Sequence, residues 1–203
     1  MSDRQWIVTL DLEGVLVPEI WIAVAEHTGV DELRLTTRDE PDYQRLMDRR
    51  IEILSRHGIT LGTIQKVIAD LPLLDGAREL LDELRARRQV VLLSDTFEQF
   101  ASHFMELLGR PHLLCHRLDV ANDRIIAFRP RIADPKLCAV RAYQSLNFHV
   151  TAAGDSHNDV TMLQAADAGC LFSAPQGLPA MYPDLAVTET YDELLTWIDR
   201  AAD

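Results

Sequence analysis

The stretch IVTLDLEGV, residues 7–15, decides the fold class of this chain. Its first four residues are apolar or β-branched, which predicts a short buried strand that ends at Asp11. Runs of apolar or β-branched residues at 90–93 and 150–153 also lead into polar residues, and helical patterns lie between the runs. Strands that alternate with helices indicate an α/β fold with a parallel sheet, whose ligands bind beyond the carboxyl ends of the strands.

The residues between the first run and the second follow a different pattern. Apolar residues recur there at helical spacing, and no strand-like run interrupts them. We therefore predict a small helical cap at 18–71, inserted after the first strand. The two flanking segments, 1–17 and 72–203, would together form the α/β core.

Composition and charge exclude several classes of protein. The 203 residues carry a net charge of −12, and no cluster of Lys and Arg could neutralise a nucleic-acid backbone. No run approaches the roughly 18 apolar residues of a membrane span. The three cysteines form no CxxC pair, which is typical of a reduced, cytoplasmic protein. We expect a soluble, unprocessed chain that handles small molecules, and the sequence is compatible with a homodimer.

Two carboxylates, Asp11 and Glu13, follow the first predicted strand. Because they lie two residues apart on a loop, one can attack as a nucleophile while the other moves protons. Ser94-Asp95-Thr96 follows the second run and is predicted to open a helix, where N–H groups and the Ser94 hydroxyl would hold a phosphate oxygen. Each motif taken alone also has an ordinary structural explanation. Asp11 and Glu13 could belong to a solvated acidic turn, and Ser94-Asp95-Thr96 could be a helix N-cap.

Two further motifs complete the set. Lys136 stands at a predicted helix start, where a cation opposes the helix dipole, and this conflict points towards a function. GDSHND, residues 154–159, follows the third run, and its acids Asp155 and Asp159 can face a hard cation such as Mg²⁺. A surface lysine and a polar loop would explain each motif alone. All four in order converge on phosphoryl transfer.

At these positions the sequence resembles the haloacid dehalogenase superfamily of phosphohydrolases. Asp11, Ser94, Lys136 and the pair Asp155/Asp159 stand in the order of that family's four motifs. The resemblance implies a Rossmann-like parallel-sheet core of haloacid dehalogenase type. It also implies that the predicted helical block is the cap of the phosphoserine phosphatase branch.

Within that branch, the bifunctional phosphoserine phosphatase/homoserine phosphotransferase group is the most similar. The similarity lies in DLEGVLVPEIW (11–21), LSDTF (93–97) and AAGDS (152–156). Phosphoserine phosphatases typically have D-x-D-S/T at the first motif, whereas Glu13 and Gly14 replace the second Asp and the hydroxyl here. In the bifunctional group the same change accompanies transfer of the phosphoryl group to homoserine.

The resemblance implies a reaction through a phosphorylated aspartate. Asp11 would attack phosphorus, and Glu13 would protonate the leaving seryl oxygen and then deprotonate water or the homoserine hydroxyl. Mg²⁺ would be held by Asp11, the main-chain carbonyl of Glu13 and Asp155. Asp159 would orient the metal's water or Lys136 from behind.

The resemblance also implies how the substrate is held. Glu19 would bind the substrate ammonium and Arg50 its carboxylate, with Arg49 as the alternative. The phosphoryl group would be bound by four residues: Ser94, Asp95, Lys136 and Asn158.

The expected activity is therefore that of a phosphoserine phosphatase and homoserine phosphotransferase of serine biosynthesis. The alternative within the superfamily is a phosphatase for another small phosphomonoester. We do not favour a dehalogenase, because its chemistry would not need the acid–base group Glu13. The alternative from another class is a non-catalytic receiver module, which also has an acidic pocket. The predicted helical insertion after the first strand argues against it, because a receiver module has none.

Overall fold

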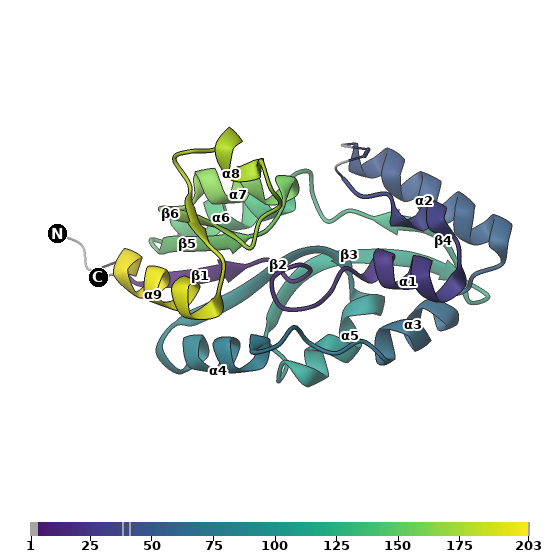
Figure 1. Ribbon diagram of the computed structural model, residues 1–203, viewed down its shortest axis with the longest axis horizontal. Coiled ribbons are helices and arrows are strands. Elements are labelled where there is room, and N and C mark those ends of the chain that lie inside the picture. The colour runs from purple at the N-terminus through teal and green to yellow at the C-terminus, as the bar shows by residue number, and fades with distance from the viewer. Residues whose placement is uncertain (1–3, 38, 41, 203) are drawn as a thin grey trace.

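A seven-stranded sheet in the order β4-β3-β2-β1-β5-β6-β7 forms the centre of the computed structural model, which describes residues 4–37, 39–40 and 42–202 (Figure 1). Neighbouring strands are parallel except for β3 and β4, which form an antiparallel hairpin. This arrangement confirms the predicted α/β class. The strands are β1 (Trp6–Leu10), β2 (Gln89–Phe97), β3 (His112–Ala121), β4 (Arg124–Arg129), β5 (His149–Gly154), β6 (Ala168–Phe172) and β7 (Ala186–Thr188).

Helices cover both faces of this sheet (Figure 1). One face is covered by α4 (Ala77–Arg87), α5 (Glu98–Leu107) and α9 (Tyr191–Ala202). The other face is covered by α6 (Pro135–Ser145), α7 (Val160–Ala165) and the short α8 (Leu178–Met181). None of the helices in the described ranges is both long and apolar enough to cross a bilayer.

Strand β1 shows why the predicted strands have apolar residues at successive positions. Successive side chains of a strand point to opposite faces, so Ile7 packs with the helices on one face while Val8 and Leu10 pack with those on the other. All three are almost completely buried. A strand covered on both faces has no position at which a polar residue would be preferred.

The chain reverses its direction of travel across the sheet beside β1. It runs outward from β1 to β2 and β3, and then returns to β5 on the other side of β1. Asp11 directly follows β1, and Asp155 directly follows β5. This reversal is the position at which open α/β sheets bind their ligands.

The helices of residues 18–71 lie beside the hairpin end of the sheet (Figure 1). They are α1 (Ile20–Thr28), the short 3₁₀ turn η1 (Asp31–Arg34), α2 (Tyr43–His57) and α3 (Leu61–Ala69). Asp123, in the hairpin turn, accepts the N–H of Leu61 at its carbonyl (2.8 Å) and that of Gly62 at its carboxylate (2.9 Å). The hairpin turn therefore satisfies the first N–H groups of α3, which would otherwise lack partners.

One local prediction is wrong. Ser94-Asp95-Thr96 lies within strand β2, and α5 begins only at Glu98. The strand continues because Phe97 resumes the parallel pairing, opposite His116 of β3, after an irregularity in the register. Ser94 therefore stands at the carboxyl end of a strand and not at a helix N-terminus.

Candidate active site

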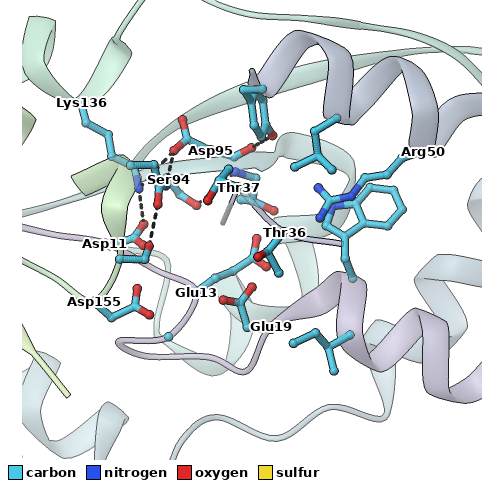
Figure 2. A pocket seen from close by; sticks show the side chains of 18 residues that line it. Asp11, Glu13, Glu19, Thr36, Thr37, Arg50, Ser94, Asp95, Lys136 and Asp155 are labelled. Atoms are coloured by element: carbon cyan, nitrogen blue, oxygen red, sulfur yellow. Dashed lines mark hydrogen bonds and ion pairs between the residues drawn. The ribbon is translucent and has the colours of Figure 1, made fainter. Parts of the chain in front are cut away.

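A cavity of about 300 Å³ lies where β1, β2 and β5 end and the helices α1 and α2 face the sheet (Figure 2). It brings together all of the predicted site residues except Asp159, which is completely buried behind it. Those that line it are Asp11, Glu13, Glu19, Arg50, Ser94, Asp95, Lys136, Asp155 and Asn158. Figure 2 shows Asp11, Asp155 and Lys136 at one end, Arg50 at the other, and Glu13 and Glu19 between them.

Lys136 is the cationic centre of the first end. Its Nζ donates to Asp11 Oδ1 at 2.9 Å and to Asp159 Oδ1 at 2.7 Å, and lies 3.2 Å from Asp95 Oδ2. Burial alone would lower the pKa of this ammonium, but the three carboxylates raise it well above its ordinary value. The side chain, only 2% exposed, therefore stays charged and orients the Asp11 carboxylate.

Three acids form a compact oxygen-rich cluster. Asp11, Asp155 and Asp159 each offer a carboxylate oxygen within 4.8 Å of the others. Asp159 is already engaged, since Oδ1 accepts from Lys136 and Oδ2 accepts the N–H groups of Asp155 and Ser156 at 3.1 Å each. Burial, followed by the charges of Asp159 and Glu19, raises the pKa of Asp155 to about 7. A hard divalent cation would relieve this crowding of carboxylates.

Two glycines make room for the acids. A Cβ on Gly154 would lie 2.4 Å from Asp159 Cγ, and one on Gly14 would lie 2.5 Å from Asp155 Cγ. Gly14 also has a φ of +79°, which side chains rarely adopt. The glycine that stands in place of the usual Ser or Thr therefore has a structural reason: any side chain there would displace Asp155.

Asp95 contacts Asn158 and His116 through its side chain and Tyr43 through its main-chain carbonyl. Its Oδ2 accepts from Asn158 Nδ2 at 2.7 Å, and its Oδ1 lies 3.4 Å from His116 Nε2. Burial opposes its ionisation, but Lys136, His116 and Asn158 hold its pKa well below the usual range. Its main-chain carbonyl accepts the hydroxyl of Tyr43, on α2, at 2.6 Å. The amide of Asn158 is thus directed at Asp95.

Glu13 has the properties of a group that exchanges protons near neutral pH. Its Oε2 accepts the N–H of Ile20, the first residue of α1, at 3.0 Å. Burial and then the charge of Glu19 raise its pKa to about 7, against the opposing effects of the Ile20 N–H and the Arg50 charge. Both protonation states are therefore accessible at neutral pH, as acid–base catalysis requires.

Arg50 forms the other end of the cavity. Its guanidinium lies 4.5 Å from the centre of the Trp21 ring, and Nη2 donates to the Leu35 carbonyl at 2.8 Å. The residue is only 6% exposed, and its Nε has no hydrogen-bond partner in the described part of the chain. Burial lowers its pKa to about 10, so it remains a cation. Arg49, the alternative, is exposed and does not line the cavity.

Several lining residues were not singled out from the sequence: Trp21, Thr36, Thr37 and Tyr43. Nor was His116, although this buried histidine directly follows the apolar run Leu113-Leu114-Cys115 and accepts the Arg131 N–H at Nδ1. A polar residue at the end of an apolar run was the signal that could have found it. The others carried no such signal, because the packing of the segment from α1 to α2 against the sheet decides which of its residues face the cavity.

Comparisons with known proteins identify the family to which this chain is similar. The family model of haloacid dehalogenase-like hydrolases matches residues 7–167. Phosphoserine phosphatase ThrH of Pseudomonas aeruginosa PAO1 is 53% identical, over 93% of this chain and 92% of its own. A phosphoserine phosphatase of Pseudomonas syringae pv. tomato DC3000 is also 53% identical, over 93% and 80%. A substrate-bound phosphoserine phosphatase structure shares the fold with a TM-score of 0.80 at 18% identity, covering 97% of this chain and 99% of that one.

Proposed function

This chain belongs to the haloacid dehalogenase-like hydrolases, and from that membership we propose that it is a phosphoserine phosphatase that also transfers the phosphoryl group to homoserine. The observation that carries the proposal is the cavity itself, which has a buried lysine beside Asp11 at one end and the buried guanidinium of Arg50 at the other (Figure 2). One end suits a phosphoryl group and the other a carboxylate. The names of the Pseudomonas relatives support phosphoserine as the substrate.

The proposed cap at 18–71 and core at 1–17 and 72–203 supply different parts of this site. Glu19 and Arg50 come from the cap segment, whereas Asp11 and Lys136 come from the core. In this proposal the cap reads the amino-acid part of the substrate, with Glu19 bound to its ammonium, and the core performs the chemistry. The cap also keeps water away from the reacting atoms, which a second alcohol needs if it is to compete.

In the first proposed step, an Asp11 carboxylate oxygen attacks phosphorus and the bond from phosphorus to the seryl oxygen breaks. Lys136 holds the attacking carboxylate in place through Oδ1. Glu13 gives its proton to the departing seryl oxygen, so serine leaves as a neutral alcohol. Ser94, the main chain of Asp95, Lys136 and Asn158 are proposed to contact the phosphoryl oxygens.

The second proposed step reverses the proton transfer. Glu13, now a carboxylate, takes the proton of a water or of the homoserine hydroxyl, and the oxygen of that molecule attacks phosphorus. The bond between phosphorus and the Asp11 oxygen breaks, which regenerates the free carboxylate. Glu13 suits both steps because its pKa is raised to about 7, near neutral pH.

Mg²⁺ is the proposed cofactor, and the residues present fit it. The donors are oxygens only, and the raised pKa of Asp155 reflects carboxylate repulsion that a cation would offset. Asp11, Asp155 and the Glu13 carbonyl would hold the ion, while Asp159, whose oxygens are engaged, would stay behind them. When bound, the ion supplies positive charge that offsets the negative charge of the phosphoryl oxygens.

Gly14→Ala is expected to weaken the dependence on Mg²⁺ by displacing Asp155. The left-handed φ should cost about 1–2 kcal/mol of unfolding free energy, and the Mg²⁺ concentration for half-maximal phosphate release should rise tenfold or more. Gly58→Ala is the matched control, since its φ is +65° but a Cβ there meets nothing within 4 Å. Equal Mg²⁺ requirements in the two variants would contradict the role given to Gly14.

Arg50→Ala is expected to lower kcat/KM for phosphoserine by roughly 100-fold, because a charge-assisted contact to the substrate carboxylate is lost. Phosphoethanolamine, which has no carboxylate, should be hydrolysed by the variant and the wild type at similar rates. Arg49→Ala, on the exposed side of the same helix, should change neither rate. A loss of equal size on both substrates would show that Arg50 supports the fold and not the carboxylate.

The function is tested by incubating the protein and Mg²⁺ with phosphoserine, with and without homoserine. We expect release of phosphate from phosphoserine alone, and formation of phosphohomoserine when homoserine is added. A panel of other small phosphomonoesters, run in parallel, tests the alternative substrate class. The phosphoserine assignment fails if another member of that panel is preferred, and the transferase assignment fails if homoserine yields no phosphohomoserine.

A further inference from the structure

Helix α2 lies along the active-site cavity with one of its faces. Tyr43, Leu46 and Arg50 all line the cavity, at the spacing i, i+3 and i+7 that places residues on the same side of a helix. A helix rises 1.5 Å per residue, so Tyr43 and Arg50 lie about 10 Å apart along its axis. Arg50 therefore forms the end proposed for the substrate carboxylate, and Tyr43 stands two turns before it on the same helix.

The first turn of α2 is tied to strand β2 by a hydrogen bond. Tyr43, the first residue of the helix, donates its hydroxyl to the main-chain carbonyl of Asp95 at 2.6 Å. Burial, and then the charge of Asp95, holds the pKa of this hydroxyl well above its ordinary value, so its proton stays available to the carbonyl. Among the hydrogen bonds of the described residues, this one alone joins α2 to a strand.

The residue that accepts this bond belongs to the other end of the cavity. Oδ2 of Asp95 lies 3.2 Å from Lys136 Nζ and accepts from Asn158 Nδ2 at 2.7 Å, so Asp95 is held among the groups proposed to bind the phosphoryl group. The ring of Tyr43 packs edge-to-face on Phe128 of β4, with 5.7 Å between the ring centres. The Tyr43 hydroxyl thus connects the helix that carries Arg50 to the phosphoryl end of the site.

The contacts of the guanidinium itself do not make this connection. Arg50 donates to the Leu35 carbonyl and lies over the ring of Trp21, and both residues belong to the segment between β1 and α2. These contacts hold the guanidinium within its own layer of helices. They leave its distance from Lys136 to the packing of α2 and to the Tyr43 hydroxyl.

We propose that Tyr43 is a positioning residue that makes the site selective for phosphomonoesters that carry a carboxylate. Its hydroxyl fixes α2 to Asp95, and thereby holds the Arg50 guanidinium at the distance from Lys136 that such a substrate spans. A substrate gripped at both ends is sensitive to this distance, whereas one gripped only by its phosphoryl group is not. The inference rests on the proposed function, because it takes Arg50 as the contact for the substrate carboxylate.

Tyr43→Phe removes the hydroxyl and keeps the ring that packs on Phe128. We would measure kcat/KM with phosphoserine and with phosphoethanolamine, which keeps the ammonium but has no carboxylate. The variant should lose roughly tenfold with phosphoserine and less than about threefold with phosphoethanolamine. In the Arg50→Ala background, the same substitution should cost less than about threefold with phosphoserine, because the contact that it positions is already absent.

Tyr191→Phe is the matched control. Tyr191, on α9, also donates its hydroxyl to a main-chain carbonyl at 2.6 Å, that of Val15. The control therefore loses the same kind of hydrogen bond without changing α2, and any effect on kcat/KM should be equal for the two substrates. Thermal unfolding of every variant shows that each is folded.

Other results would overturn the inference. If Tyr43→Phe keeps the wild-type kcat/KM with phosphoserine, or loses equally with both substrates, Tyr43 does not set the selectivity, while the phosphoserine assignment stands. Full losses from both substitutions in the double variant would show that Tyr43 does not act through Arg50. If the wild type does not prefer phosphoserine to phosphoethanolamine, the carboxylate contact of the proposed function fails, and this inference fails with it.

Discussion

Asp11→Asn is expected to abolish turnover of phosphoserine, by a factor on the order of 10⁴ or more, because an amide oxygen cannot form the acyl phosphate. The fold should survive, since Lys136 keeps Asp95 and Asp159 as partners after the charge of Asp11 is removed. Phosphate release measures the activity. Mass spectrometry of acid-quenched protein should show one added phosphoryl group on the wild type and none on the variant.

Asp48→Asn is a suitable control for this experiment. Asp48 is an exposed residue of α2 that accepts a hydrogen bond from Gln44, and it does not line the cavity. Its amide variant should turn over and become phosphorylated as the wild type does. Substantial turnover by Asp11→Asn, or a phosphoryl group on another residue of the wild type, would remove Asp11 as the nucleophile.

The sequence was sufficient to predict that several of these residues lie together, and the reason lies in the sheet. Parallel strands end at one edge, so Asp11 after β1 and Asp155 after β5 had to lie together once the strands were identified. Lys136 could be suspected because its place at a helix start conflicts with the dipole. Its three carboxylate partners resolve that conflict. The two that accept its hydrogen bonds, Asp159 and Asp11, lie 23 and 125 residues away along the chain.

Other parts of the site depend on packing that no local pattern contains. The choice between Arg49 and Arg50 rested on resemblance, and only the docking of α2 shows which guanidinium is buried against Trp21. Ser94-Asp95-Thr96 was predicted to open a helix, but pairing with β3 keeps these residues in a strand. Long-range pairing here overrides a local preference, as is common for strands.

Lys136→Met is expected to have the second large effect, on stability as well as on activity. It leaves Asp11, Asp95 and Asp159 without their common cation, and such a loss typically costs about 3–5 kcal/mol of unfolding free energy. Phosphate release should fall roughly 100-fold or more, because the charge beside the attacking carboxylate is gone. Denaturant unfolding, in a chelator to exclude divalent ions, measures the first effect.

The loss of stability should depend on pH in a definite direction. Burial and neighbouring charges raise the pKa of Asp155 to about 7 and that of Asp11 well above its ordinary value, while Lys136 opposes both shifts. A carboxyl whose pKa is higher in the folded state contributes stability below its unfolded pKa and loses it as pH rises through the folded one. The variant should therefore be least impaired near pH 4 and increasingly impaired up to pH 7 and beyond.

A second substitution distinguishes charge from packing in this result. Asp159→Asn keeps an oxygen for the N–H groups of Asp155 and Ser156 but removes one of the uncompensated charges. Combined with Lys136→Met, it should restore about 1–2 kcal/mol of stability without restoring activity, since the cation is still missing. Lys66→Met, at the chain's other lysine, lies on the exposed side of α3 and should change little. If the double variant is no more stable than Lys136→Met, the destabilisation comes from the cavity and not from unpaired carboxylates.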